Sequence, residues 1–502
     1  MALDPRTPVL VGGGQFSNRV DEGAEALEPV DLLAEAARRA AADTGAADAG
    51  KVLAAVDSVR VVQLLSWRYR DPGRLVAERI GASDVRHTLY THAGGNTPQS
   101  LVNRTCLDIA GGRADVVLIG GAEAWRTRMS FKGLDARPPW THQADDVAPT
   151  ETFGGEFALD AMVHPAEMAR GIVMPVQFYP MFESALRAEA GATHTEWAAH
   201  LGRLWSGFSA VAATNPNAWI QESFTAEELV APSPTNRMIG FPYPKRLNSN
   251  NAVEQGGAVL LCSVDAAERL GIPRDAWVFP QAGTDAHDTA HVSSRGDLRS
   301  SPAIRVAGRR ALELAGVGPD DIAHVDVYSC FPSAVQIAAK ELGLGLDRQL
   351  TVTGGLSFAG GPWNNYVSHA IAAMVGVLRE HPGDVGLVTA NGGNITKHAF
   401  GLYATEPPAE GFRWDAPDAE VEAATSARLP ADGAYAGPVS VEAYTVMHDR
   451  AGDAEVGLCA LLTPAGERAW GRTDDDAALA AMVDTEVVGR DAELAGDGTV
   501  RF

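Results

Sequence analysis

A helix-and-strand pattern that occurs twice along the chain limits its possible folds more than any other feature. In each copy an expected helix leads into a short apolar strand, and the strand ends in paired glycines, Gly120-Gly121 and Gly392-Gly393. The two helix–strand pairs span residues 97–110, 115–119, 365–379 and 384–390. Alternating helices and buried strands are typical of a sheet covered by helices on both faces. We therefore predict an α/β chain made of two related halves.

Each half also contains an earlier helix and an earlier strand. The first half has a helix expected over 29–44 and a strand over 56–62, and the second has a helix over 301–315 and a strand over 324–328. The strand segments AAVDSVRVV and AHVDVYSCF follow their helices in the same way. We interpret this agreement of pattern as an internal duplication.

A chain of 502 residues exceeds one ordinary hydrophobic core, which predicts two or three domains. We expect a first half over 1–265, a second half over 266–408 and a further domain over 409–502. The first half contains a long insertion, 122–248, and such insertions are commonly lids or functional subdomains. After Pro407-Pro408 the composition changes, and two strands are expected around a turn. We predict a small β-rich, OB-like domain there.

The charge and the cysteines exclude several classes of protein. The formal net charge is −23, so nucleic acid, which requires a basic face, is not an expected partner. We expect no membrane span, because no run of about 18 apolar residues occurs, and no signal peptide. The four cysteines are scattered without a CxxC pair, so we expect neither a metal site nor disulfides. A reducing cytoplasm fits this pattern.

Basic residues gather at the two ends of the insertion of this acidic chain. They are Arg126, Arg128, Lys132 and Arg137 at its start and Lys245 and Arg246 at its end. One interpretation is contact with a polyanionic ligand, such as the phosphates of a coenzyme; the other is ordinary surface charge.

Four short segments, in order, identify a family resemblance. They are KRLNSNNAVEQGGAVLL (245–261), YSCF (328–331), GGP (360–362) and ANG (390–392). Together with the duplicated pattern they resemble the thiolase superfamily over about residues 5–406. The resemblance implies a thiolase fold: two βαβαβαββ halves layered α-β-α-β-α, with an inserted loop domain. It is greatest to thiolase-like proteins with an extra C-terminal domain, many of which are named acetyl-CoA acetyltransferase.

The sequence departs from the family at three reactive positions. The family spacing places the nucleophilic cysteine on Gly95, the catalytic histidine on Gly361 and the second catalytic cysteine on Ala390. The nearest thiol, Cys106, lies three turns along the expected helix, where we expect a core residue. Thiolysis needs a thiolate, a base that forms it and an acid/base at the α-carbon. We therefore expect no conventional thiolase turnover.

The resemblance suggests three replacement catalytic residues, each with a structural alternative. Cys330 stands where some relatives have an acid/base cysteine, but it is equally compatible with an inert core thiol. Tyr366 resembles the tyrosine that performs acid/base work in related steroid side-chain aldolases, or it is a packed tyrosine. His398 is either a general base or a structural histidine.

We expect the substrate to contact the residues around these groups. Two helix starts, near Thr97 and Asn365, favour developing negative charge in the pocket. The candidate substrate-binding residues are Asn96, Thr97, Tyr328, Phe331, His369, Gly392 and Gly393. Asn96 and Thr97 either donate hydrogen bonds to a substrate carbonyl or cap the helix. His369 either acts with Tyr366, with which it shares a helix face, or belongs to the core.

Three functions remain open. The favoured one is an enzyme that acts on acyl-CoA thioesters without a covalent intermediate, through carbon–carbon lyase, Claisen-type or thioester-cleaving chemistry. The second is a non-catalytic acyl-CoA binding or scaffold protein, and the third is an acetyl-CoA acetyltransferase that uses Cys330. Coenzyme A enters as part of the substrate, so no resident cofactor is expected. Since family members associate through the first-half sheet, a homodimer is possible.

Overall fold

The computed structural model describes residues 3–19, 26–154 and 162–502. Part of the predicted insertion, residues 155–161, therefore lies outside the described residues. Within the described ranges, no helix combines the length and the apolar character needed to cross a bilayer.

The two halves contain sheets with the same internal arrangement. The first sheet runs β1-β8-β4-β2-β3-β5 and the second β10-β11-β12-β9-β13. Their strands are β1 (Pro8–Ser17), β2 (Ser58–Val61), β3 (His87–Thr91), β4 (Val116–Ala124), β5 (Glu151–Phe153), β8 (Glu254–Ser263), β9 (Phe279–His287), β10 (Ile322–Asp326), β11 (Val385–Gly392), β12 (Lys397–Ala404) and β13 (Arg413–Asp415). In each sheet one parallel pair, β2/β4 or β10/β11, is followed by two antiparallel pairs. The predicted duplication is confirmed.

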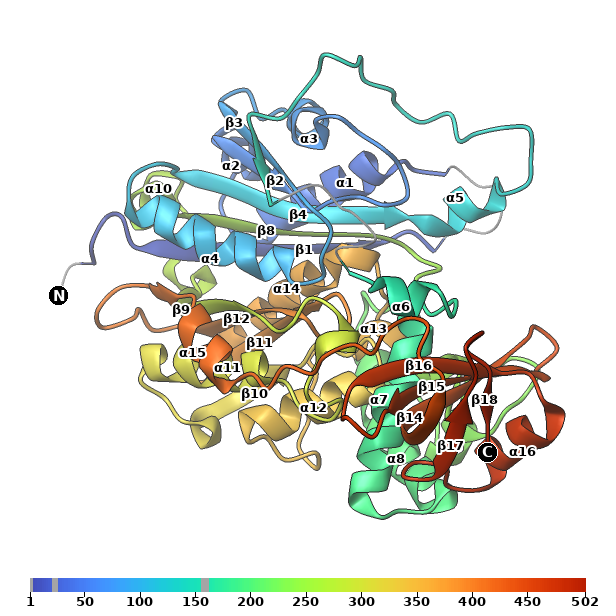
Figure 1. The fold of residues 1–502 in the computed structure, drawn as a ribbon. Coiled ribbons are helices and arrows are strands. Elements are labelled where there is room, and N and C mark those ends of the chain that lie inside the picture. Colours follow the sequence, from blue (N-terminus) through green and yellow to red (C-terminus); the bar gives the residue numbers. More distant parts are fainter. Residues whose placement is uncertain (1–2, 20–25, 155–161) are drawn as a thin grey trace.

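Helices separate and cover the two sheets (Figure 1). Between the sheets lie α4 (Thr97–Ala110) and α14 (Tyr366–Glu380), which contact strands of both. The outer faces are covered by α1 (Pro29–Asp43), α2 (Ala49–Ala54), α3 (Pro72–Ile80) and α10 (Val264–Arg269) in the first half and by α11 (Pro302–Ala315) and α12 (Pro332–Leu342) in the second. The α-β-α-β-α layering implied by the resemblance is confirmed.

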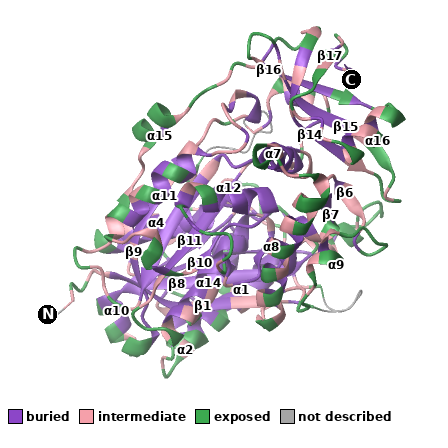
Figure 2. Ribbon diagram, turned by 90° about the horizontal axis from the view of Figure 1, so that it is seen from below, coloured by how far each residue is buried: buried purple, intermediate pink, exposed green. Residues whose placement is uncertain are grey.

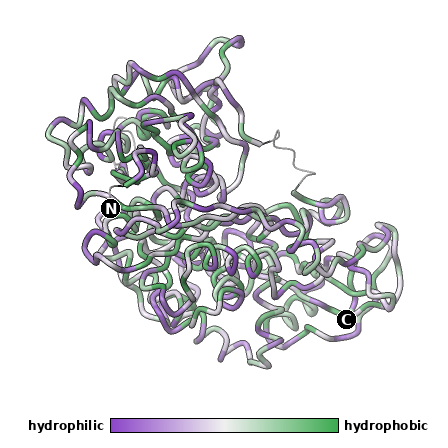
Figure 3. Tube along the Cα trace, turned by 90° about the vertical axis from the view of Figure 1, so that its left-hand side faces the viewer, coloured by the Kyte–Doolittle hydropathy of each residue, from purple (hydrophilic) through white to green (hydrophobic). Residues whose placement is uncertain are grey.

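The burial of each helix follows from its sequence. In α4, residues from Thr97 to Ile109 are buried around most of the helix, as expected for a helix enclosed on all sides. In α1 the buried residues form one stripe, and charged residues such as Arg39 face solvent. Figure 2 shows the continuous buried layer at the centre of the molecule, and Figure 3 shows hydrophobic segments concentrated in the same interior.

The insertion is mainly helical. It contains α5 (Trp125–Ser130), α6 (Pro165–Met168), α7 (Pro175–Ala190), α8 (His194–Thr214) and α9 (Ala226–Val230), together with β6 (Met238–Gly240), β7 (Tyr243–Pro244) and a short 3-10 turn, η2 (Lys245–Leu247). The helix α7 is buried over residues 178–187, because it packs between α12 and the C-terminal sheet.

The C-terminal region is β-rich, as predicted. The sheet runs β16-β15-β14-β17-β18, and β6 of the insertion pairs with β14. Its elements are β14 (Gly437–His448), β15 (Ala454–Leu462), β16 (Arg468–Thr473), β17 (Asp491–Leu494), β18 (Val500–Arg501) and α16 (Asp476–Asp484), preceded by α15 (Asp418–Ala424). A bridge between Arg472 and Thr499 closes the sheet on itself. We call β14–β18 the C-terminal barrel; the OB-like topology and the domain boundaries stay predictions.

The edge of the first-half sheet bears on the possible homodimer. The outer side of β3 is occupied, because β5 pairs with it in parallel, Leu89 opposite Glu151. The strand at this edge of the sheet is therefore β5, which is only three residues long, and short edge strands resist pairing with another chain.

We therefore expect the protein to be a monomer at micromolar concentration. Light scattering coupled to gel filtration, at low and at moderate salt, should give the mass of one chain. A mass of two chains that persists on dilution would show that a surface other than the β3 edge associates.

Candidate functional site

A cavity of about 310 Å³ opens where segments from both halves and the insertion meet. Its described lining comprises Leu65, Ala93–Gly95, Met162, Val163, residues 173–176, Tyr179, Ser249, Asn251, Tyr328, Cys330, Phe331, Leu356, Trp363, Asn364 and residues 391–394. The residues just before α4 and α14 are among them, so both helix starts lie at the cavity. A larger, more open hollow beside α8, about 760 Å³, is lined by none of the predicted site residues.

Two glycines allow the loops of the two halves to approach closely at this cavity. A Cβ on Gly95 would lie 2.4 Å from both the carbonyl oxygen of Asn391 and the hydroxyl of Tyr328. A Cβ on Gly392 would lie 2.6 Å from Oδ1 of Asn96. The position expected for a nucleophile therefore has no room for a side chain, and the Tyr328 hydroxyl occupies that space.

Cys330 is the thiol at the cavity, and it belongs to a small polar cluster with Tyr179 and Asn391. The Nδ2 of Asn391 lies 3.1 Å from the Tyr179 hydroxyl and 4.0 Å from the sulfur of Cys330. The Tyr179 hydroxyl also donates to the carbonyl of Gly393 at 3.2 Å. Burial raises the pKa of the Cys330 thiol to about 12 and holds the pKa of Tyr179 well above its usual value. Both groups are therefore neutral near pH 7.

Sequence reasoning did not identify Tyr179. It lies on α7, within the insertion, and its ring stacks on Phe331 with centroids 4.4 Å apart. The stretch VQFYP predicts a helix but does not indicate which side faces the reaction centre. Asn391 was recognised only as part of the ANG motif, and Asn364, which accepts from the Gly94 N–H at 3.0 Å, was not singled out.

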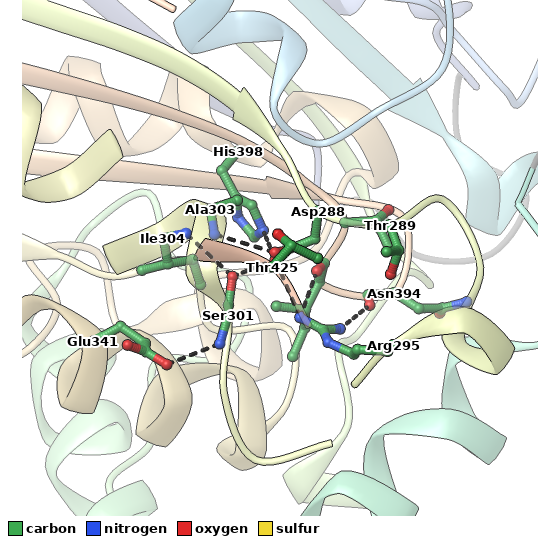
Figure 4. Close-up of polar contacts among 12 residues, drawn as sticks. Asp288, Thr289, Arg295, Ser301, Ala303, Ile304, Glu341, Asn394, His398 and Thr425 are labelled. Carbon is green, nitrogen blue, oxygen red and sulfur yellow. Dashed lines mark hydrogen bonds and ion pairs between the residues drawn. The ribbon is translucent and has the colours of Figure 1, made fainter. Parts of the chain in front are cut away.

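The other two catalytic candidates lie outside the cavity lining. The hydroxyl of Tyr366 is 2.9 Å from Oδ1 of Asp326 and 2.6 Å from the Thr353 hydroxyl, so it satisfies a buried carboxyl. The Nε2 of His398 lies 3.5 Å from Oδ2 of Asp288, within a charged cluster behind the loop 392–396 (Figure 4). Of the three, the structure brings only Cys330 to the cavity.

The predicted substrate-binding residues divide in a similar way. Tyr328, Phe331, Gly392 and Gly393 line the cavity. His369 is instead buried on α14, its Nδ1 3.1 Å from Oε1 of Gln15, and burial lowers its pKa to about 4.

Asn96 and Thr97 are buried at the start of α4. The Thr97 hydroxyl donates to the carbonyl of Gly94 at 2.8 Å, which is a local capping role. Among the described residues, Oδ1 of Asn96 and Oδ1 of Asn391 are buried without a hydrogen-bond partner. Buried polar atoms are normally paired, so these two amide oxygens are exceptions at the junction of the two halves.

Basic groups lie near the wall of this cavity, whereas the metal-ligating group lies away from it. Trp125 of α5 packs on Trp363 with ring centroids 4.9 Å apart, which places the helix carrying Arg126 and Arg128 beside the cavity wall. Within the described ranges, the group able to offer a metal three ligand atoms is His324, His381 and Asp384. It lies at the opposite ends of β10 and β11 from the cavity.

A substitution at Gly95 tests the close approach of the loops. We expect Gly95→Ala to destabilise the protein by about 1–3 kcal/mol, because the new methyl group overpacks a rigid contact. Gly207→Ala on α8 is the matched control, since a Cβ there meets nothing within 4 Å and should be neutral or stabilising. Denaturant unfolding measures both; equal stabilities of the two variants would contradict the expectation.

The pKa of Cys330 predicts its reactivity. With a pKa of about 12 the thiolate fraction at pH 7 is about 10⁻⁵, so alkylation by iodoacetamide should be slow and rise about tenfold per pH unit from pH 8 to 10. Mass spectrometry of the Cys330 peptide measures the rate. Cys106, fully buried and away from the cavity lining, should be labelled only on unfolding. Fast labelling of Cys330 at pH 7 would instead indicate an activated thiolate.

Comparison with known proteins gives the following similarities. Residues 284–347 match the family described as thiolase C-terminal domain-like, and residues 419–499 match the thiolase-like protein type 1 additional C-terminal domain. A monomeric SCP2-thiolase like protein type 1 from Mycobacterium smegmatis is 32% identical, with a TM-score of 0.82 and 99% of each chain covered. An acetyl-CoA acetyltransferase of Methanocaldococcus jannaschii is 26% identical over 53% of this chain and 62% of the relative's length. The Ltp2-ChsH2(DUF35) aldolase, 20% identical with a TM-score of 0.57 over 80% of this chain and 99% of that one, shares the fold.

Proposed function

Because this chain belongs to the thiolase superfamily and carries an additional C-terminal domain, we propose that it binds acyl-CoA thioesters and acts on them without a covalent acyl-enzyme intermediate. The observation that supports the proposal is the packing of Gly95 against Tyr328 and Asn391. It leaves no space for a nucleophilic side chain at the reaction centre, while neutral hydrogen-bonding groups remain around the cavity.

The cavity wall fits the acyl part of such a ligand. Val163, Val173, Val176, Phe331 and Leu356 provide an apolar surface, and ligand pockets are commonly apolar with a few placed polar groups. We assign the thioester carbonyl to the end of the cavity beside the start of α4, where the helix dipole favours negative charge on oxygen. The phosphates of coenzyme A are assigned to the exterior near α5, beside Arg126 and Arg128.

The favoured reaction is cleavage or formation of the carbon–carbon bond between the α- and β-carbons of a β-hydroxyacyl thioester. In the cleavage direction the electron pair of that bond passes to the thioester oxygen as an enolate, and the β-hydroxyl becomes a carbonyl. Cys330, neutral at pH 7, gives its proton to the α-carbon. The proton of the β-hydroxyl passes through the Tyr179 hydroxyl to the sulfur of Cys330 as the thiol proton moves to the α-carbon, so the thiol is regenerated. Asn391 takes no part in the proton transfer; its Nδ2 group orients the Tyr179 hydroxyl and the thiol.

A non-catalytic acyl-CoA binding protein is the second candidate, and the lining of the cavity favours it. Among the described residues that line the cavity, none is a carboxylate, imidazole or amine. A general base works best with a pKa near the operating pH, whereas burial raises the pKa values of Cys330 and Tyr179.

Acetyl-CoA acetyltransferase activity through Cys330 is disfavoured for the same reason, since it requires the thiolate. The cytoplasmic location stays a prediction, and four unpaired cysteines fit it.

Calorimetry with coenzyme A and a panel of acyl-CoA thioesters, followed by mass spectrometry of the same samples, tests these candidates. We expect acyl-CoA binding with a released or rearranged product. Cys330→Ala and Tyr179→Phe should lower turnover by about 10²-fold, the contribution typical of a positioned acid/base group, with little loss of affinity.

Cys459→Ala, which removes a buried thiol from the C-terminal barrel, is the matched control and should leave turnover unchanged. Binding with intact ligand would select the non-catalytic candidate. The absence of any binding by the wild-type protein would refute both.

A further inference from the structure

The C-terminal barrel contributes no described residue to the cavity, whose described lining ends at Asn394. It nevertheless contacts segments that carry cavity residues. We propose that the barrel sets the shape of the substrate site from outside, with Arg468 and Trp470 as positioning residues that act through Arg295 on the loop 392–396. The effect on ligand binding depends on the proposed function; the effect on the loop does not.

The first step is the contact between the barrel and the turn at residues 292–295. Arg468 on β16 is fully buried and donates to the backbone carbonyls of Val292, at 2.7 Å, and Arg295. Two further donor groups of its guanidinium bind both carboxylate oxygens of Glu442 at 2.7 Å, which fixes its orientation. A buried, bidentate arginine is a rigid support.

Trp470 holds the same turn from the next inward-facing position of β16. Its indole N–H donates to the hydroxyl of Ser293 at 2.8 Å. The backbone N–H and hydroxyl of Ser293 both donate to Oε1 of Glu167 on α6, each at 2.7 Å. Because α6 follows directly after Met162 and Val163, this contact also joins the barrel to a second part of the cavity wall.

The second step leads from the turn to the cavity loop. Arg295 is buried, and its guanidinium donates to the carbonyls of Asn394 and Ile395, both at 3.0 Å. The guanidinium also donates to Oδ2 of Asp288 at 3.2 Å, and His398 and Ser301 converge on the same carboxylate (Figure 4). Burial opposes ionisation of Asp288, but these partners lower its pKa to about 2. The loop is therefore attached to a charged pair that stays ionised at pH 7.

The loop needs such a support because its backbone is strained. Ile395 has a φ of +57°, and a β-branched residue is rarely found in the left-handed region. Among the described residues that are not glycine, the other positive φ, +48°, belongs to Trp363, which also borders the cavity. Strained residues persist only where their surroundings hold them, and they cluster at functional sites. Two carbonyl contacts from Arg295 act at and next to Ile395.

The barrel also contacts α7, the helix that carries Tyr179. The backbone N–H of Tyr444 donates to the hydroxyl of Ser184 at 2.9 Å, and Arg187 donates to the Tyr444 hydroxyl at 2.8 Å. Both sides of the polar cluster, Tyr179 on α7 and Asn391 at the end of β11 just before the loop, are thus supported by the same barrel.

Hydrogen exchange measured by mass spectrometry on the full-length protein tests the proposal without a ligand. In Arg468→Met, we expect the amides of residues 391–396 to exchange at least about tenfold faster than in wild type, because local opening becomes easier. Trp470→Phe keeps an aromatic ring but removes the indole N–H that binds Ser293, together with the five-membered ring that carries it, so a smaller increase than in Arg468→Met is expected in the same peptide. Arg472→Met is the matched control, since its exposed side chain lies on the same strand, and exchange in 391–396 should not change.

Faster exchange confined to residues 292–295, with 391–396 as in wild type, would overturn the proposal. If Arg468→Met does not fold, the test uses Trp470→Phe alone. Exchange in residues 391–396 that is unchanged in Trp470→Phe would then also overturn the proposal. Calorimetry then measures the affinity of each variant for acyl-CoA. The affinity should fall in Arg468→Met and Trp470→Phe and stay unchanged in Arg472→Met. If the wild-type protein binds no acyl-CoA, the proposed function fails, but the exchange data still decide the role of the barrel.

Discussion

The structure depends on one shared layer: α4 and α14 lie between the two sheets and contact both. A helix enclosed in this way cannot carry exposed charge along its length, and α4 is accordingly buried nearly from end to end. The layer also fixes the position of the cavity. Because both helices begin at the same end of the sheets, the segments before them, Gly94-Gly95 and Trp363-Asn364, meet the loops that follow β10 and β11 there.

The distribution of charge around this centre is uneven. The cavity itself is bordered by neutral groups whose pKa values are raised by burial, whereas buried ions occur behind its wall as pairs, Asp288 with Arg295 and Glu442 with Arg468. A buried pair is a weak source of stability but leaves a large penalty if one partner is removed, so it favours a single arrangement of the segments that carry it. The interior of the cavity is therefore neutral, and the ion pairs lie in the segments that contact its loops.

Much of the fold was predictable because it depends on local pattern. The helix predicted over 97–110 has those bounds in the structure, and the strands predicted over 115–119 and 384–390 correspond to the first part of β4 and most of β11. The motif residues Tyr328, Cys330 and Phe331 were found through the segment YSCF, which resembles a thiolase motif.

The remaining site residues could not be derived from local pattern. The direction of Tyr366 depends on a buried carboxyl, Asp326, forty positions away in sequence, and that of His398 on Asp288. Tyr179 comes from an insertion whose placement is set by packing against α12 and the C-terminal barrel.

The covalent connection of the barrel to the rest of the chain affects how often the barrel is docked. Its docking surface combines apolar contacts, such as that of Trp470 with Phe178 of α7, with the hydrogen bonds of Arg468 and Tyr444, and a separate protein with such a surface would associate only at sufficient concentration. Within one chain, the effective concentration is on the order of millimolar for a short flexible connection. Occupancy of the docked state is thereby independent of expression level.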